Sequence, residues 1–110
     1  MTSTPASGFQ PTELVAQADH RLPDILADIE RVISIETPSS DKEAVATGAR
    51  DFAALLRDRL GAEAELLEVE GTAHLRLRFG TGPARVVLLT HQATVWPHGT
   101  LERIPFSTAD

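Results

Sequence analysis

The sequence predicts an α/β fold made of two N-terminal helices, a β-hairpin and a buried strand. Apolar residues recur at helical spacing in two stretches, residues 24–36 and 41–60. They then alternate with polar residues over residues 74–79, as in a strand with one buried face. An unbroken apolar run at residues 86–89 indicates a strand that is covered on both faces.

Length and composition set the outer limits. The chain has 110 residues, of which 42% are hydrophobic and 24% charged, values that fit one globular domain or a piece of a larger one. The net charge is -6 and no basic cluster is present. Nucleic acids and anionic membrane surfaces are therefore poor partners. The apolar runs are also far shorter than the roughly 20 residues that cross a bilayer.

Residues 1–11 are expected to form a flexible tail, and residues 12–110 the folded part. The first ten residues have neither the basic start nor the apolar centre of a secretory signal, so the cytoplasm is the default compartment. The sequence contains no cysteine. Disulfides, thiolate catalysis and cysteine-bound zinc are therefore excluded.

Each helix has its own sequence signals. An earlier helical stretch could start at Thr12, with Pro23 beginning or bending the next one and Thr37-Pro38 ending it. The apolar face of that helix comprises Ile25, Leu26, Ile29, Val32 and Ile33. In the second helix, Ser40 and Glu43 match a capping box, and Gly61 suits the C-terminal cap. Its expected buried face comprises Val45, Ala49, Phe52, Leu55, Leu56 and Leu60.

The second half of the chain reads as three strands and a loop. Residues 65–70 and 74–79 flank a turn at Gly71-Thr72 and predict an antiparallel hairpin, with glutamates of the first strand facing arginines of the second. In the second strand, Leu75, Leu77 and Phe79 are expected to face the core. The buried strand at residues 85–90 ends at His91, and residues 91–110 read as a loop.

His91 is the leading candidate for a functional residue. In α/β sheets, ligands bind beyond the carboxyl ends of the strands, and a neutral imidazole there is a good metal ligand. The alternative is that His91 only ends a strand and donates a hydrogen bond to a neighbour. His98 is more simply read as solvated than as a second ligand, His74 as structural, and a site role for His20 has no support.

The residues around His91 add a resemblance to a known family. The stretch Thr94-Val95-Trp96-Pro97-x-Gly99-Thr100-Leu101, followed by Pro105-Phe106, resembles the metal-binding strand end of the M20 metallopeptidases, in particular the glutamate carboxypeptidase branch. The upstream stretch Ile33-Ser34-Ile35-Glu36-Thr37-Pro38-Ser39 is similar to a segment near the start of those enzymes. The resemblance covers residues 24–110.

The resemblance implies a zinc-peptidase catalytic domain with a mixed sheet and two divalent metals, usually zinc. Such enzymes hydrolyse amide bonds beside a free carboxylate, in peptides or N-acyl amino acids, by attack of a metal-bound water with a glutamate as general base. By this resemblance His91 matches a histidine that binds the first metal. Trp96 would line the substrate pocket or, alternatively, only pack the loop against the sheet.

Two departures from the family pattern weaken the expectation of activity. The family places an aspartate two residues after the histidine, where this chain has Ala93. Loss of such a supporting carboxylate commonly costs about 10–100-fold in metal affinity or activity. The remaining ligands and the general base belong to family segments beyond residue 110, including a Gly-Pro-Gly-x-x-Asp segment. We therefore expect residues 12–110 to be a partial, inactive catalytic domain.

A different class of function stays open beside the hydrolase. The same residues could form a non-catalytic α/β interaction module, or a fragment that needs a complementary chain. An incomplete sheet leaves an edge and one face uncovered, which favours self-association or binding of a partner.

Overall fold

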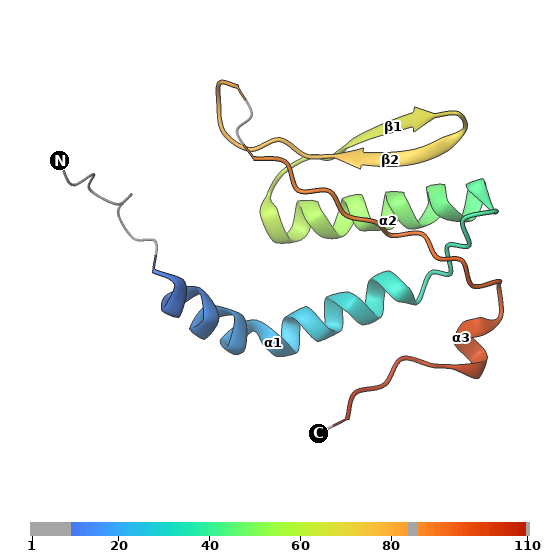
Figure 1. Cartoon of the computed structure of the whole chain (residues 1–110), viewed down its shortest axis with the longest axis horizontal. Helices are drawn as coiled ribbons and strands as arrows, with labels where there is room; N and C mark the ends of the chain where they lie inside the picture. Colours follow the sequence, from blue (N-terminus) through green and yellow to red (C-terminus); the bar gives the residue numbers. More distant parts are fainter. Residues whose placement is uncertain (1–9, 84–85, 110) are drawn as a thin grey trace.

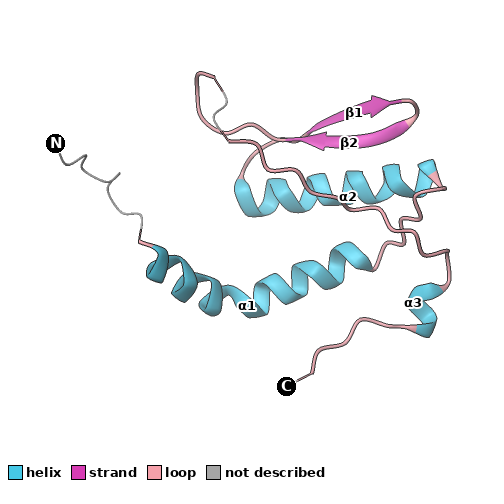
Figure 2. Cartoon of the chain, in the orientation of Figure 1, coloured by secondary structure: helices cyan, strands magenta, loops and turns pink. Residues whose placement is uncertain are grey.

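The computed structural model describes residues 10–83 and 86–109 of the chain. In chain order its elements are α1 (Pro11–Ile33), α2 (Lys42–Leu60), β1 (Glu65–Val69), β2 (Thr72–Arg76) and the short α3 (Thr100–Arg103). Figures 1 and 2 show the two long helices side by side, with the hairpin on the far side of α2 from α1. The small α/β class predicted from the sequence is therefore confirmed, with a two-stranded antiparallel sheet.

Helix α1 is one continuous helix, where the sequence suggested two stretches. It begins at Pro11, in the first-turn position that tolerates proline, and it contains Pro23 in its interior. Figure 1 shows the helix changing direction near its middle, as expected where a proline removes a hydrogen bond. The predicted end at Thr37 is wrong by one turn, because Ser34 already caps the helix through its backbone N–H and its hydroxyl, both donating to the Glu30 carbonyl.

Helix α2 supplies the centre of the fold. Its N-cap is Asp41, whose side chain accepts from the Ala44 N–H at 3.0 Å, so the predicted cap at Ser40 is off by one residue. The predicted C-cap is confirmed, since Gly61 adopts the left-handed conformation with a φ of 65°. Helix α2 supplies the buried aliphatic side chains among the described residues, Val45, Ala49 and Leu55, and Pro38 in the preceding connection is also buried.

The hairpin packs on α2 through β2. Its strands pair antiparallel, with Glu65 opposite Arg76 and Leu66 opposite Leu75, and both strands are shorter than predicted. The expected cross-strand charge pairing is confirmed for Glu65, whose carboxylate accepts from Arg76 Nε at 3.1 Å. Phe79 lies beyond β2 and is 68% exposed, so its predicted place in the core is wrong.

The predicted buried strand is not formed. Residues 86–90 belong to no strand and are all exposed, with Leu88 and Leu89 at 87% and 92%. No backbone hydrogen bond between described residues involves Val86–Leu89. The prediction of a strand covered on both faces is therefore wrong for the described residues, because no other described segment pairs with this run or buries it. The expected mixed sheet is correspondingly absent from residues 10–83 and 86–109.

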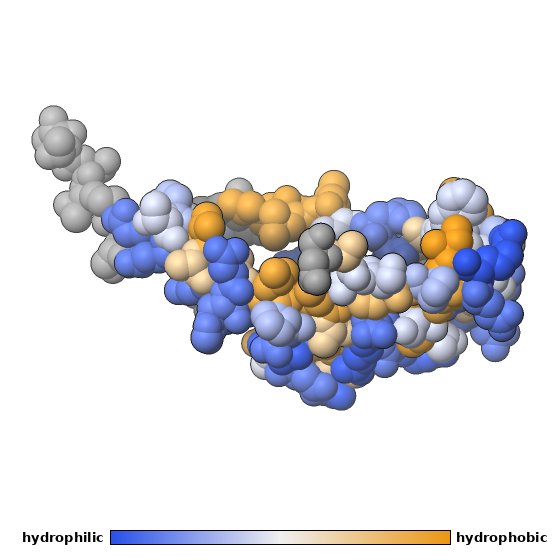
Figure 3. Space-filling view, turned by 90° about the horizontal axis from the view of Figure 1, so that it is seen from below, coloured by the Kyte–Doolittle hydropathy of each residue, from blue (hydrophilic) through white to orange (hydrophobic). Residues whose placement is uncertain are grey.

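Three ion pairs connect α1 to α2, the longest of which joins Arg31 to Asp58 at 4.0 Å. Arg59 forms two 2.8 Å hydrogen bonds with Asp28, and Arg31 contacts Asp51 at 3.0 and 3.2 Å. Helix α1 nevertheless has no buried residue, and the apolar face predicted for it is only partly covered. Figure 3 shows apolar surface exposed between hydrophilic flanks on one side of the molecule.

Two further predictions concern the N-terminal tail and membrane-spanning segments. Of the predicted tail, residues 1–9 lie outside the described residues, and Pro11 already belongs to α1. Within the described part of the chain, no helix combines the length and the apolarity needed to cross a membrane.

Candidate functional site

The two stretches that carry the family resemblance lie against each other. Residues 37–39, between α1 and α2, run parallel to residues 92–94, with a bridge between Pro38 and Thr94. The Thr94 N–H donates to the Thr37 carbonyl at 2.9 Å, and the Ser39 N–H donates to the Thr94 carbonyl at 2.7 Å. Segments more than 50 residues apart in sequence thus form one unit.

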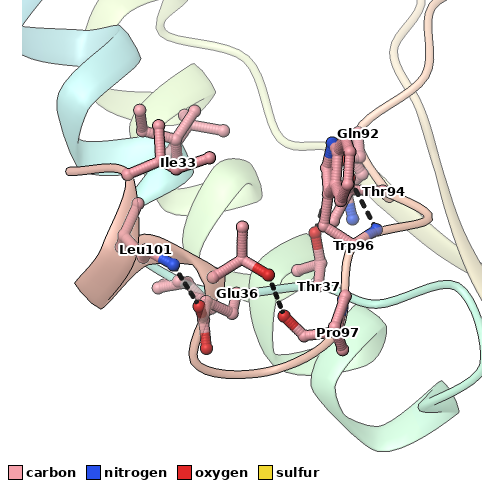
Figure 4. A pocket seen from close by; sticks show the side chains of 12 residues that line it. Ile33, Glu36, Thr37, Gln92, Thr94, Trp96, Pro97 and Leu101 are labelled. Atoms are coloured by element: carbon pink, nitrogen blue, oxygen red, sulfur yellow. Dashed lines mark hydrogen bonds between the residues drawn. The ribbon is translucent and has the colours of Figure 1, made fainter. Parts of the chain in front are cut away.

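Side chains reinforce this junction. The Thr37 side chain is 7% exposed, and its hydroxyl donates to the Gln92 carbonyl at 3.2 Å. The Gln92 amide in turn donates to the carbonyl of Val45 at 3.4 Å, which ties the segment to the first turn of α2. Figure 4 shows Thr37 and Gln92 close together, with Thr94 beside them.

The Glu36 carboxylate fixes the backbone at the start of α3. Its carboxylate accepts backbone hydrogen bonds from Gly99, at 2.9 and 3.1 Å, and from Leu101 at 2.9 Å. These N–H groups lie at the start of α3, where an acceptor satisfies otherwise unpaired donors. The bonds from Gly99 and Leu101, followed by His98, lower the pKa of Glu36 below its ordinary value.

His98 lies between two carboxylates. Its Nε2 is 2.9 Å from Asp41 Oδ2, and its Nδ1 is 3.5 Å from Glu36 Oε2. The hydrogen bond with Asp41, with a smaller contribution from Glu36, raises the pKa of His98. The pKa of Asp41 is lowered, mainly by the Ala44 N–H and then by His98. His98 is exposed, as a solvated histidine would be, but its imidazole also contacts two carboxylates, which the sequence did not predict.

Residues 92–104 border a small cavity. It has a volume of about 330 Å³ and lies between the end of α1, residues 35–37 and the segment 92–104. Its walls include Val32, Ile35, Trp96 and Leu101, and Glu36 is its one ionisable lining residue. Figure 4 shows Trp96 and Glu36 on different sides of the space. Trp96 is 61% exposed and can therefore still meet a ligand, as one of its two predicted roles requires.

The other predicted site residues are not brought together. His91 is exposed, and Ala93, which is partly buried, contributes no polar group. Within residues 10–83 and 86–109, no cluster of three or more histidine, cysteine, aspartate or glutamate side chains could hold a metal ion. His20 and His74 are also exposed.

Glu36, Asp41 and His98 were missed as a group by sequence reasoning. They lie 5 to 62 positions apart in the chain, and only the docking of the two segments makes them neighbours. Comparison of the chain with protein-family models, with curated proteins and with solved structures finds no match.

Proposed function

We propose that this chain is the N-terminal part of a metal-dependent hydrolase of the M20 type, a carboxypeptidase or aminoacylase that cleaves amide bonds beside a free carboxylate. The proposal includes zinc as the metal, peptides or N-acyl amino acids as substrates and the cytoplasm as the compartment. His91 supplies one metal ligand and Trp96 one wall of the substrate pocket.

One observation carries the proposal. The two stretches that resemble the family are joined by hydrogen bonds between residues 37–39 and 92–94 and by the Glu36 carboxylate. The two stretches therefore stabilise each other in the fold, which explains why both occur in one chain. The junction begins one residue after His91 and holds the chain that follows this histidine in a defined path.

The described residues do not by themselves fit a two-zinc centre. Such a centre needs several carboxylates and more than one histidine, whereas His91 has no clustered donors near it. The carboxylates of Glu36 and Asp41 are engaged by backbone N–H groups and by His98. In the proposal the other ligands and the general base come from segments outside this chain, and the 110-residue protein alone is inactive.

Zinc titration tests the predicted inactivity. By calorimetry, we expect the 110-residue chain to bind no zinc tightly. Any weak heat of zinc binding is expected to be the same in His98→Ala as in the unchanged chain. Any weak binding is expected to fall in His91→Ala, because this exposed imidazole is the ligand assigned. Tight binding of two zinc ions, or turnover of an N-acyl amino acid, would show that the inactivity is wrongly assigned.

Ala93 gives a second measurement for the same proposal. In a longer protein that contains this chain and a Gly-Pro-Gly-x-x-Asp segment, Ala93→Asp is expected to raise hydrolysis by about 10–100-fold, because a carboxylate would then orient the His91 ligand. Ala93→Asn is the matched control, since it adds nearly the same volume without the charge. Equal rates in both variants would contradict the role given to this position, and a longer reading frame without that segment would contradict the family.

A second function is favoured by the exposed apolar run. Val86–Leu89 is extended, unpaired within the described residues and between 73% and 92% exposed. Unpaired apolar strands are templates for pairing with another chain. The alternative is therefore a non-catalytic interaction module, whose fold is completed by a partner chain or by a second copy.

Light scattering after size-exclusion chromatography decides whether this run makes contacts between copies. We expect the mass of the eluting species to rise with concentration, and Leu88→Lys to abolish the rise, because a charge cannot be buried unpaired. Leu66→Lys is the matched control, since Leu66 is also exposed but lies on a paired strand. A compact monomer at every concentration would rule out self-association.

A further inference from the structure

We propose that His98 is a pH-dependent latch, which holds residues 96–98 against the start of α2 when its imidazole is protonated and loosens them when it is neutral. The inference does not depend on the hydrolase proposal, because it uses only contacts within the described chain. It assigns a conformational role to the Glu36, Asp41 and His98 group.

The geometry places His98 at the meeting point of three parts of the fold. Asp41 is the N-cap of α2, and Glu36 lies between α1 and α2. The imidazole reaches one carboxylate with each ring nitrogen, at 2.9 Å and 3.5 Å. A neutral imidazole carries one N–H and can donate to only one of them, whereas a protonated ring donates from both nitrogens.

The rest of the surroundings add no competing charge. Among the described residues, Asp41 and Glu36 are the charged side chains within 4.0 Å of His98. Both are acidic and both have lowered pKa values, so they stay ionised while the imidazole titrates. A positive ring is therefore favoured at this position, and a neutral ring loses the attraction.

The direction in which the latch depends on pH follows from the raised pKa of His98 and the lowered pKa values of Glu36 and Asp41. The raised pKa of His98 means that its contribution is complete below the ordinary histidine value and is lost as pH rises through the folded-state value. The lowered pKa values of Glu36 and Asp41 mean that their contribution is lost as pH falls through those values. The latch is therefore strongest between about pH 4.5 and pH 6.5.

Opening the latch has a defined structural consequence. Residues 99–101 would keep the Glu36 bonds, but the link from His98 to the start of α2 would weaken from an ion pair to at most a single hydrogen bond from a neutral ring. Trp96 and Pro97 line the 330 Å³ cavity, so the wall of that cavity becomes looser at high pH. Because Trp96 is the one tryptophan in the sequence, its fluorescence reports this change without a label.

The test combines histidine titration by NMR with tryptophan emission across pH 4.5–9. We expect His98 to titrate above the ordinary histidine value, and Trp96 emission to change in step with His98. The step is expected to vanish in His98→Gln and to remain in His20→Gln, the matched control at an exposed histidine.

A second variant separates the latch from the helix cap. Asparagine caps helices as well as aspartate, so Asp41→Asn keeps the start of α2 while it removes the charge facing His98. This variant is expected to lower the pH at which His98 titrates and to move the emission step with it. A step that persists in His98→Gln, or a His98 titration that Asp41→Asn leaves unchanged, would overturn the proposal.

Discussion

Replacing Gly48 by alanine is expected to destabilise the folded chain by about 1–3 kcal/mol, because the new methyl group has no room. A Cβ built on Gly48 overlaps Cγ2 of Thr37 and also meets Ile35. Alanine is the better helix former by about 1 kcal/mol, so intrinsic preference predicts the opposite sign. Urea denaturation followed by circular dichroism measures the difference.

A rescue variant identifies the cause. Thr37→Ser removes the methyl group that Gly48 faces and keeps the hydroxyl that donates to Gln92. The double variant is therefore expected to recover most of the stability lost in Gly48→Ala. Thr47→Ala, at an exposed position of the same helix, controls for the effect of alanine on α2. Stabilisation by Gly48→Ala alone would refute the close contact with Thr37.

Replacing Leu55 by alanine is expected to have the largest effect, about 2–5 kcal/mol. Leu55 is 6% exposed and is the largest of the buried side chains that α2 contributes. Removal of its branch leaves a gap at the centre of a small core, which has few other contacts to compensate. The urea midpoint is expected to fall sharply, or the variant to lose its helical signal.

Leu60 provides the matched comparison on the same helix. The sequence pattern places it on the buried face with Leu55, but the structure leaves it 53% exposed. Leu60→Ala is therefore expected to cost about 1 kcal/mol or less. Equal losses in the two variants would contradict the central place given to Leu55 in the core.

Local signals in the sequence predicted most of the secondary structure. The 3.6-residue period gave the body of both helices and Gly61 gave the end of α2. The hairpin was also predicted, although its turn lies at residues 70–71, one residue earlier than expected. Errors arose where a local signal has two outcomes. Pro23 can start a helix or bend one, and Ser40 and Asp41 are both good caps, so neighbouring contacts decided between them.

Tertiary relations were less accessible to sequence reasoning. An apolar run such as Val86–Leu89 is typical of a buried strand. The run alone does not specify which other segments would bury it. The same limit applies to the site. His91 and Trp96 could be chosen from their motif, whereas the bonds of Glu36 to Gly99 and Leu101 depend on the docking of distant segments.

The exposed run at Val86–Leu89 also has consequences for the life of the protein in a cell. Extended, uncharged apolar segments are what holding chaperones bind and what aggregation recruits. If a partner chain or a second copy covers this segment, as the second proposed function requires, covering it would also hide it from chaperones. Under that proposal, the steady-state level of the protein would report how much of it is assembled.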